Sequence, residues 1–301
     1  MARRSWIMFG FLAAFWGASY LFIKVALEDG LGPMVIVFLR CLLAAAVLLP
    51  VAAHLGALKG MRSRLGRVLV LSLLQVALPF TLITVGEQEL SSSLTGILVA
   101  AAPIFTFLLA YALEGEERAS ALSLIGVALG IGGVAVLLGV DAPGGLGALA
   151  GGLMVVLAGL CYAVAAWFLK RRLPGVQPVG TVAGTTAATA VMTLPLAALD
   201  LPARAPGLDA VASLIALGVL GTGLAFVLFH ALVAAEGPRS TSLVAYVAPA
   251  FSVVYGVTLL DESFTLATAA GLVLIVGGSW LAAEGRLPRA ARTPRRCPDP
   301  A

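Results

Sequence analysis

Arg40 is a charged residue inside a long apolar stretch of the sequence. Counted from Pro33, where the stretch begins, it lies about 10 Å along a helix that rises about 1.5 Å per residue. A cation at that depth is costly to leave in an apolar environment, so such residues usually face a cavity or a polar partner. Arg40 could anchor a carboxylate or another anionic group. Alternatively, it is a structural arginine whose long stem lets the guanidinium reach outward, toward Glu87 or Glu89.

Six further residues in apolar stretches carry polar or aromatic groups that could line an amphipathic cavity. Some stand in pairs at equivalent positions of an internal repeat described below. Gln75 falls in the middle of its stretch, where an amide needs a partner. Packing would account for several of the aromatic residues, and a threonine can satisfy its hydroxyl on its own helix. The candidate binding residues, including Arg40, are Trp16, Arg40, Gln75, Thr95, Tyr162, Thr241 and Tyr246.

A second group of residues could bend helices or close their ends. Pro103 and Pro249 lie within apolar stretches, and a proline removes one backbone donor and frees a carbonyl of the preceding turn. We expect them to act as hinges or to expose backbone polar groups to a cavity. Glu116 and Glu262 fall at the ends of the same stretches. They could latch gates or carry protons, although holding helix ends and loops in place is the simpler role.

The composition indicates a membrane protein. Of the 301 residues, 60% are hydrophobic and 11% charged, whereas about 25% of residues are charged in soluble domains. The formal charge of +4 comes from short basic clusters between apolar segments, which argues against a nucleic-acid partner. Three cysteines without paired spacing and two scattered histidines predict neither a disulfide framework nor a metal site. No motif predicts a cofactor.

Ten stretches have the length of about 20 apolar residues that a membrane-spanning helix needs. Their connections are short, so we expect one helical body. The N-terminal stretch begins like a cleavable signal peptide, but its apolar run continues far enough to span, and we interpret it as the first helix. The predicted spans cover residues 6–27, 33–53, 67–86, 92–113, 121–140, 148–169, 177–199, 209–231, 240–260 and 264–283.

The basic residues predict the orientation of these spans. With the N-terminus inside, the cytoplasmic segments hold 16 of the 19 basic residues, and the external loops hold only Arg204. Lys24 and Arg40 fall within spans. This distribution follows the positive-inside rule. We therefore expect both termini in the cytoplasm, with residues 285–301 forming a basic cytoplasmic tail.

The sequence contains an internal repeat at a nearly constant offset. Lys24 ends the segment WGASYLFIK, and Lys170 ends YAVAAWFLK, 146 positions later. The segments Pro103–Glu116 and Pro249–Glu262 are related by the same offset. The glycine-rich segments GVALGIGG and GLVLIVGG follow at an offset of 145. A series in register from the first helix of each half to the last indicates duplication.

Each copy of the repeat contains five spans, with residues 1–140 forming the first copy and 148–284 the second. An odd number of spans forces the second copy to enter the membrane from the opposite side. The sequence therefore predicts an all-α integral membrane protein of ten transmembrane helices in two inverted five-helix repeats. This symmetry is common in secondary transporters, because two similar halves can exchange inward-open and outward-open shapes.

In these features the sequence resembles the drug/metabolite transporter superfamily, specifically its EamA-type ten-helix permeases. The resemblance extends to about residue 284. It rests on W-G-A-S-Y-x3-K at residues 16–24, on Pro33 with Arg40, on the two P-x12-E segments and on the glycine-rich fifth and tenth helices. It implies an inner-membrane carrier of amino acids, other metabolites or drugs, often an exporter. It also implies a central cavity bounded by both halves, with the fifth and tenth helices at the periphery.

Several functions compete at this point. The first is a secondary carrier that moves a small organic metabolite (an amino acid or related compound, or a drug) by alternating access. We expect it to export that cargo across the bacterial inner membrane. No P-loop appears, so an ion or proton gradient, exchange or downhill flow must supply the energy.

The alternatives are an intramembrane lipid-modifying enzyme, a lipid flippase, or an assembly subunit without transport activity. An enzyme needs a nucleophile, an acid–base pair or a metal cluster within mutual reach, and the sequence shows none, so we expect no enzyme activity. The expected partners are a small-molecule substrate and the lipid bilayer, with the chain as a monomer or homodimer.

Overall fold

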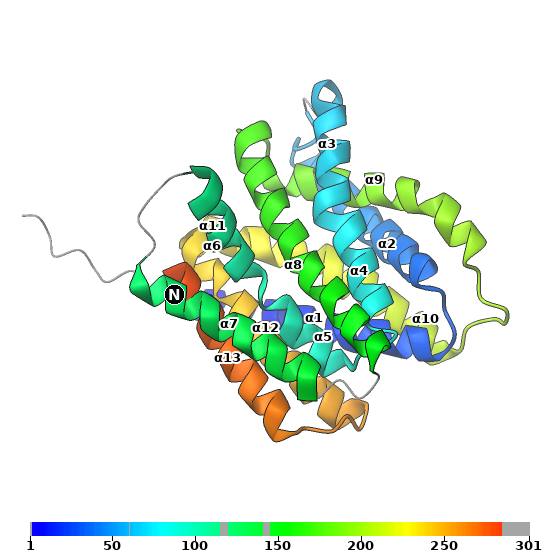
Figure 1. Ribbon diagram of the computed structural model, residues 1–301. Helices are drawn as coiled ribbons and strands as arrows, with labels where there is room; N and C mark the ends of the chain where they lie inside the picture. Colours follow the sequence, from blue (N-terminus) through cyan, green and yellow to red (C-terminus); the bar gives the residue numbers. More distant parts are fainter. Residues whose placement is uncertain (1, 60, 115–119, 141–144, 285–301) are drawn as a thin grey trace, which may run out of the picture.

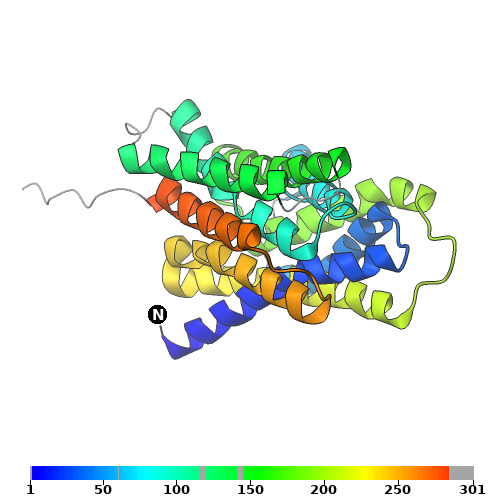
Figure 2. The same cartoon turned by 60° about the horizontal axis from the view of Figure 1, so that its bottom comes forward.

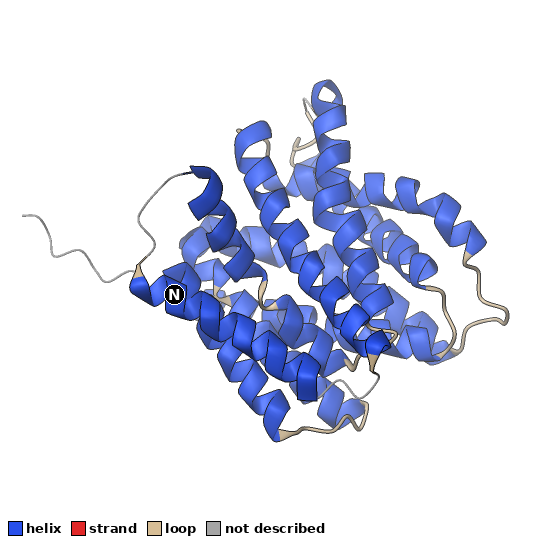
Figure 3. Cartoon of the chain, in the orientation of Figure 1, coloured by secondary structure: helices blue, strands red, loops and turns tan. Residues whose placement is uncertain are grey.

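Apolar stretches of this length fold as helices because, away from water, a helix pairs its backbone polar groups within one segment. The computed structural model describes residues 2–59, 61–114, 120–140 and 145–284 (Figure 1). These ranges contain helices and loops but no strand (Figure 3). Ten helical segments are long and apolar enough to cross a membrane. The predicted fold class is confirmed. Glu116 and the basic tail lie outside the described residues.

The described helices follow the order of the ten predicted spans. The first half contains α1 (Arg3–Glu28), α2 (Pro33–His54), the short 3-10 helix η1 (Arg62–Arg64), α3 (Leu65–Ser72), η2 (Leu73–Ala77), α4 (Leu78–Gly86), α5 (Ser92–Val99), α6 (Ala102–Glu114) and α7 (Ala121–Val140). The second half contains α8 (Leu146–Arg172), α9 (Pro178–Leu199), α10 (Leu208–Ile215), η3 (Ala216–Leu224), α11 (Ala225–Ser242), α12 (Val244–Leu259) and α13 (Leu266–Glu284).

The third and eighth spans each contain a π-helical segment, which the sequence analysis did not predict. In the third span η2 joins α3 to α4, and in the eighth η3 joins α10 to α11. Pro79 gives a physical reason for the first. It lacks the N–H that would bind the carbonyl of Gln75 four residues earlier, which favours a wider turn. Single π-helical turns inside α-helices are frequent at functional sites.

The spans that carry the paired prolines are interrupted at different places. The fourth span is broken at Ala100 and Ala101, directly before α6, and Pro103 is the second residue of that helix. Pro249 lies inside the continuous helix α12, and the ninth span is broken earlier, at Leu243. The two halves therefore do not bend alike. The hinge role of the two prolines stays a prediction.

Helices of the first half pack against helices of the second. The contacts pair α1 with α12, α2 with α9, and α4 with α8. The fifth and tenth spans, α7 and α13, lie side by side along one edge of the bundle (Figures 1 and 2). At Gly126 an added Cβ would meet the backbone of Gly278 at 2.7 Å. The absence of side chains at these glycines lets the two helices pack closely at this crossing.

The loops divide the molecule into two faces. The N–H of Ala2 donates to Glu236 Oε1 (3.2 Å), which joins the start of the first span to the end of the eighth. On the opposite side, Asp29 accepts from the N–H of Gly207 (2.8 Å). The start of α1 and the end of α13 lie on the same side (Figure 2). We call that side the terminal face and the opposite side the far face.

Candidate functional site

A cavity of about 670 Å³ lies between the two halves. Its walls come from α1, α2, η2, α4, α5 and α6 of the first half and from α8, η3, α11, α12 and α13 of the second. Small-molecule sites in proteins have volumes of about 300–1,000 Å³. The cavity is lined by these candidates from the sequence analysis: Trp16, Arg40, Gln75, Tyr162, Thr241, Tyr246, Pro103 and Pro249.

Two candidates lie elsewhere. Thr95 does not line the cavity: it is fully buried, and its hydroxyl donates to the carbonyl of Ser91 (3.0 Å). This is the own-helix bond that the sequence analysis offered as the alternative. Glu262 lies at the far face, where it contacts the first half of the chain. The structure therefore separates the candidates into a central group and a far-face group.

Arg40 lies in the cavity wall. A hydrogen bond and a ring contact fix its side chain, but no acidic side chain in the described residues neutralises its charge. Its Nε donates to Thr222 Oγ1 (2.8 Å), and its guanidinium carbon lies 3.7 Å from the centroid of the Phe80 ring, a cation–π arrangement. In the described part of the chain Arg40 makes no ion pair. It does not reach outward to Glu87 or Glu89, as the structural alternative supposed. The side chain is 8% exposed, and that exposed surface borders the cavity.

The π-helix η3 positions the hydroxyl that holds Arg40. Thr222 donates to the carbonyl of Leu217 (2.9 Å), five residues earlier, and its oxygen also accepts from Arg40. At Gly218 an added Cβ would meet the Leu43 Cβ at 2.5 Å and the Arg40 carbonyl at 3.2 Å. The missing side chain lets η3 approach α2 closely enough for the hydrogen bond to form.

Gln75, in η2, carries an unused acceptor in the cavity wall. Its side chain lines the cavity, and its Oε1 is buried without a hydrogen-bond partner. A buried polar atom left unsatisfied costs about 1–3 kcal/mol. The predicted need of this mid-span amide for a partner is therefore not met by the described residues. A bound molecule with an N–H or O–H group could meet it.

Aromatic rings form much of the remaining wall. The ring centroid of Trp16 lies 5.5 Å from that of Phe229 and 6.3 Å from that of Phe226. Tyr20 and Tyr162 add further rings from α1 and α8. A site that combines one cation and one acceptor with large apolar surfaces is suited to a small organic molecule with a charged end.

The cavity extends from the middle of the bundle toward the terminal face. Thr106, Phe107 and Ala110 line it from α6, which runs toward that face. Thr241, near the start of the ninth span, and Ala283, near the end of α13, also line it. Both positions are at the terminal-face ends of their spans. A ligand would therefore enter from the terminal face.

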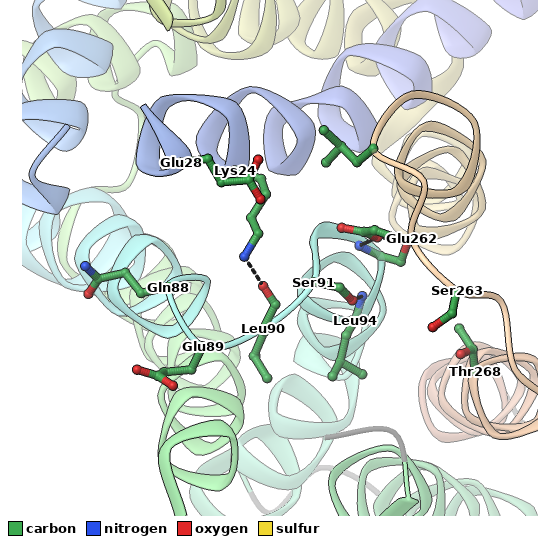
Figure 4. A pocket seen from close by; sticks show the side chains of 12 residues that line it. Lys24, Glu28, Gln88, Glu89, Leu90, Ser91, Leu94, Glu262, Ser263 and Thr268 are labelled. Atoms are coloured by element: carbon green, nitrogen blue, oxygen red, sulfur yellow. Dashed lines mark hydrogen bonds between the residues drawn. The ribbon is translucent and has the colours of Figure 1, made fainter. Parts of the chain in front are cut away.

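The far face is held closed by contacts across helices. Lys24 donates to the backbone carbonyls of Glu87 (3.2 Å) and Leu90 (2.9 Å), which ties α1 to the loop between α4 and α5 (Figure 4). A separate pocket of about 390 Å³ lies at these contacts, and Lys24 and Glu262 both line it. Lys24 thus lies near the end of α1 and bonds to another segment of the chain.

Glu262 joins the second half of the chain to the first. Asp261 takes a left-handed conformation (φ 53°) after α12, and the N–H of Glu262 folds back to the carbonyl of Gly256 (3.1 Å). The Glu262 carboxylate then accepts from the N–H groups of Ser92 (2.6 Å) and Ser93 (3.0 Å) and from the Ser93 hydroxyl. It satisfies orphan donors at the start of α5, where a negative charge is favoured.

Several cavity residues were not recognisable from the sequence. Thr222 and Phe80 contact Arg40, and Phe226 and Phe229 stack near Trp16. The glycines around Thr222 and the proline before Phe80 signal irregular helices. They do not reveal a partner that lies 182 positions away in the sequence.

The described residues contain no group of three or more His, Cys, Asp or Glu side chains that could hold a metal ion. The polar groups that face the cavity are a guanidinium, an amide, hydroxyls and phenols. This donor set suits hydrogen bonding to an organic ligand better than coordination of a cation.

A model of the EamA-like transporter family matches residues 4–139 and again residues 149–283. The chain belongs to the EamA-like transporter family. Each match covers five of the ten spans, so the chain contains two repeats that cross the membrane in opposite directions. The protein is a multi-pass membrane transporter, and its family implies a small-molecule substrate.

Similar proteins in other organisms carry transporter names. An uncharacterized transporter of Archaeoglobus fulgidus is 24% identical over 284 residues, which are 94% of this chain and 100% of that protein. The uncharacterized transporter YoaV of Bacillus subtilis is 25% identical over 91% of this chain and 96% of its own length. YvbV of the same organism is 25% identical over 91% of this chain and 89% of its own.

A solved structure shares the fold. It superimposes with a TM-score of 0.67 at 21% sequence identity, covering 94% of this chain and 97% of the other. At this identity the likeness concerns the arrangement of helices alone.

Proposed function

We propose that this EamA-family transporter is a secondary carrier that moves a small organic metabolite with an anionic group by alternating access. The cargo would be an amino acid, a related compound or a drug of similar charge. The observation that carries the proposal is Arg40, a cation without an ion pair in the described chain, facing a cavity between the two repeats. Its unmatched charge supports an anionic cargo, because a buried cation is stabilised by an opposite charge.

Three features of the cavity support an amino acid or a similar molecule. Arg40 can receive a carboxylate, and Gln75 Oε1 lacks the donor that an amino group would supply. The rings of Trp16, Tyr20 and Tyr162 offer apolar contact to the rest of the cargo. The three features together favour a zwitterion with an apolar body over a sugar or a simple inorganic anion.

Alternating access is supported by the unequal closure of the two faces. The cavity extends to the terminal face, while Lys24 and Glu262 hold helices together at the far face. In the cycle we propose, Glu262 releases α5 at the far face, and the helices around Pro103 and Pro249 change their bend. The cavity then closes toward the terminal face.

We propose that the protein is an exporter of the bacterial inner membrane with both termini in the cytoplasm. The basic residues support this orientation, since 16 of 19 fall in the segments that the sequence predicts to be cytoplasmic. With that orientation the cavity opens to the cytoplasm and loads cargo from inside. Tagging either terminus and probing it with protease in sealed cells tests the orientation, and cleavage from outside would contradict it.

Reconstitution of the purified protein in proteoliposomes tests the transport function. Uptake and efflux are measured with a panel of amino acids, sugars, nucleosides and cationic drugs. We expect saturable, protein-dependent flux of a zwitterionic or anionic compound. Absence of flux for the whole panel, together with turnover or flipping of lipid, would overturn the carrier in favour of a lipid enzyme or flippase.

Replacing the cavity cation tests the binding site. Arg40→Gln should raise the KM for an anionic or zwitterionic cargo by about 10- to 100-fold, since a hydrogen bond to a charged group contributes about 1.5–3 kcal/mol. Arg40→Lys should retain part of the affinity. The matched control is Arg204→Gln, whose arginine is 74% exposed in a far-face loop. An unchanged KM with reduced amounts of folded protein would instead indicate a structural arginine.

A further inference from the structure

Glu87 is a fully buried carboxylic acid whose side chain has no hydrogen-bond partner among the described residues. It follows Gly86, the last residue of the third span, and is 0% exposed. Neither Oε1 nor Oε2 has a hydrogen-bond partner, and within the described residues the carboxylate makes no ion pair. A carboxylate at a helix end usually reaches water cheaply, but the loop that carries Glu87 is covered by α1.

The charged groups around Glu87 are engaged elsewhere. From α1, Lys24 donates hydrogen bonds to two backbone carbonyls, and Tyr20 lines the central cavity. From α2, Arg40 binds Thr222. From the loop after α12, Glu262 binds the start of α5 and adds a negative charge nearby.

The helix α8 also packs against α4. Its buried phenol, Tyr162, lines the central cavity. None of these groups neutralises an ionised Glu87.

A buried carboxylate in such a place holds a proton. Removing an unpaired charge from water costs far more than removing the neutral acid, so the group takes up a proton instead. Burial raises the pKa of Glu87 well above its ordinary value, and the positive charge of Lys24 opposes that rise only in part.

Glu87 lies between residues that line the far-face pocket and residues that line the central cavity. Its sequence neighbours Gln88 and Glu89 line the pocket, and so does Lys24 (Figure 4). Ile83, one helical turn earlier, lines the cavity, as does Tyr20. A change that opens the far face must separate these residues and bring water to Glu87.

We propose that Glu87 is the proton-binding site through which this carrier couples cargo movement to a proton gradient. It holds a proton while the far face is closed. When the far face opens, Lys24 is freed from the two carbonyls, and Glu87 takes up its proton from the water there. After the far face closes, binding of cargo in the central cavity releases the proton toward the terminal face, so that each exported cargo is exchanged for a proton moving inward. The coupling rests on the proposed carrier function, whereas the protonation of Glu87 can be tested without it.

Infrared difference spectroscopy of the purified protein tests the protonation. At pH 7 the wild type should show the C=O stretch of a buried protonated carboxylic acid, and Glu87→Gln should lose it. The control is Glu89→Gln, the same change at an exposed position two residues away, which should retain the band. A wild-type spectrum at pH 7 without a component that depends on Glu87 would overturn the site.

The pH dependence of stability provides a second measurement. A group whose pKa is higher in the folded than in the unfolded state stabilises the fold fully at low pH. That stability is lost as the pH rises from the unfolded toward the folded value. Between pH 5 and pH 8 the wild type should therefore lose stability relative to Glu87→Gln, by up to about tenfold in the unfolding constant per pH unit. Parallel profiles would contradict the proposal.

Proteoliposomes with an imposed pH gradient test the coupling. The gradient should change wild-type flux of the best panel compound several-fold, while Glu87→Gln should keep downhill flux and lose the response. Glu89→Gln should behave as the wild type. A full response in Glu87→Gln would overturn the coupling. Absence of any wild-type flux would overturn the carrier function and the coupling, and the infrared band would then decide the proton site by itself.

Discussion

Polar side chains within the spans fall into two groups that differ in how their hydrogen bonds are made. Hydroxyls mostly bind carbonyls of their own helix, as Thr193 does with Thr189 (2.8 Å) and Ser72 with Val68 (2.7 Å). Such groups cost little to bury and carry little information about ligands. Arg40 and Gln75 retain bonding capacity that the described chain leaves unused. The second group marks where a cargo can contribute contacts that the protein lacks.

At the residue scale, Thr222→Val should destabilise the fold without changing its shape. Valine matches the size of threonine but cannot accept from Arg40, so a buried charged donor loses its partner. We expect the free energy of unfolding to fall by about 1–3 kcal/mol, measured by thermal or denaturant unfolding of the purified protein.

Thr222→Ser should restore most of that loss. The control is Thr258→Val, at an exposed hydroxyl bound to its own helix. An equal loss in the control would mean that the Arg40 bond contributes nothing.

The sequence predicted which residues are costly to bury but not which groups would bind or cover them. Arg40 was recognisable because a single cation stands in an apolar run. Its partner Thr222 was not, because packing between α2 and η3 brings them together across 182 positions. The burial of Glu87 was not recognisable, because nothing in its local sequence shows that Lys24 covers the loop. Tertiary contacts decide both cases.

At the element scale, spans are predictable because their length is set by the membrane. The predicted span 92–113 coincides with the observed Ser92–Leu113, and 33–53 differs by one residue from Pro33–His54. The π-helices were not predictable from the sequence. The segments η2 and η3 have only five and nine residues, and their wider turns leave the apolar pattern of the span almost unchanged. Only Pro79 hinted at η2, through the hydrogen bond it cannot make.

The crossing of α7 and α13 yields a prediction about helix packing. Gly126→Ala places a methyl group against the backbone of Ala282 and Gly278, so the helices must separate. We expect a loss of about 1–3 kcal/mol, the usual cost of overpacking, seen as a lower melting temperature. Gly132→Ala in the same helix is the matched control, since nothing lies within 4 Å of its added Cβ. It should be neutral or slightly stabilising.

For the whole molecule, closure of the far face depends on a bond between the two repeats. Glu262→Ala removes the carboxylate that accepts from Ser92 and Ser93, so the far face should open more often. Because hydrogen bonds to a charged group are lost, the equilibrium between the closed and open far face should shift toward the open form by about tenfold or more. A cysteine at position 19, in the cavity wall, should then react faster with a membrane-impermeant maleimide added at the far face.

That experiment uses a chain whose three native cysteines are replaced by alanine. Glu28→Ala is the control, because Glu28 lines the same far-face pocket without capping α5. Equal labelling rates in Glu262→Ala and the parent would show that the contact fixes the loop and does not gate the cavity.

The unused charge of Arg40 has a consequence for how the cargo can be found. A ligand that binds the folded state and not the unfolded chain adds stability, by about 2.7 kcal/mol at one hundred times its dissociation constant. Because the described residues leave Arg40 without an ion pair and the Gln75 oxygen without a donor, the right molecule should cause a marked rise in melting temperature. Thermal unfolding of the purified protein with candidate compounds can thus identify the cargo before any membrane is reconstituted.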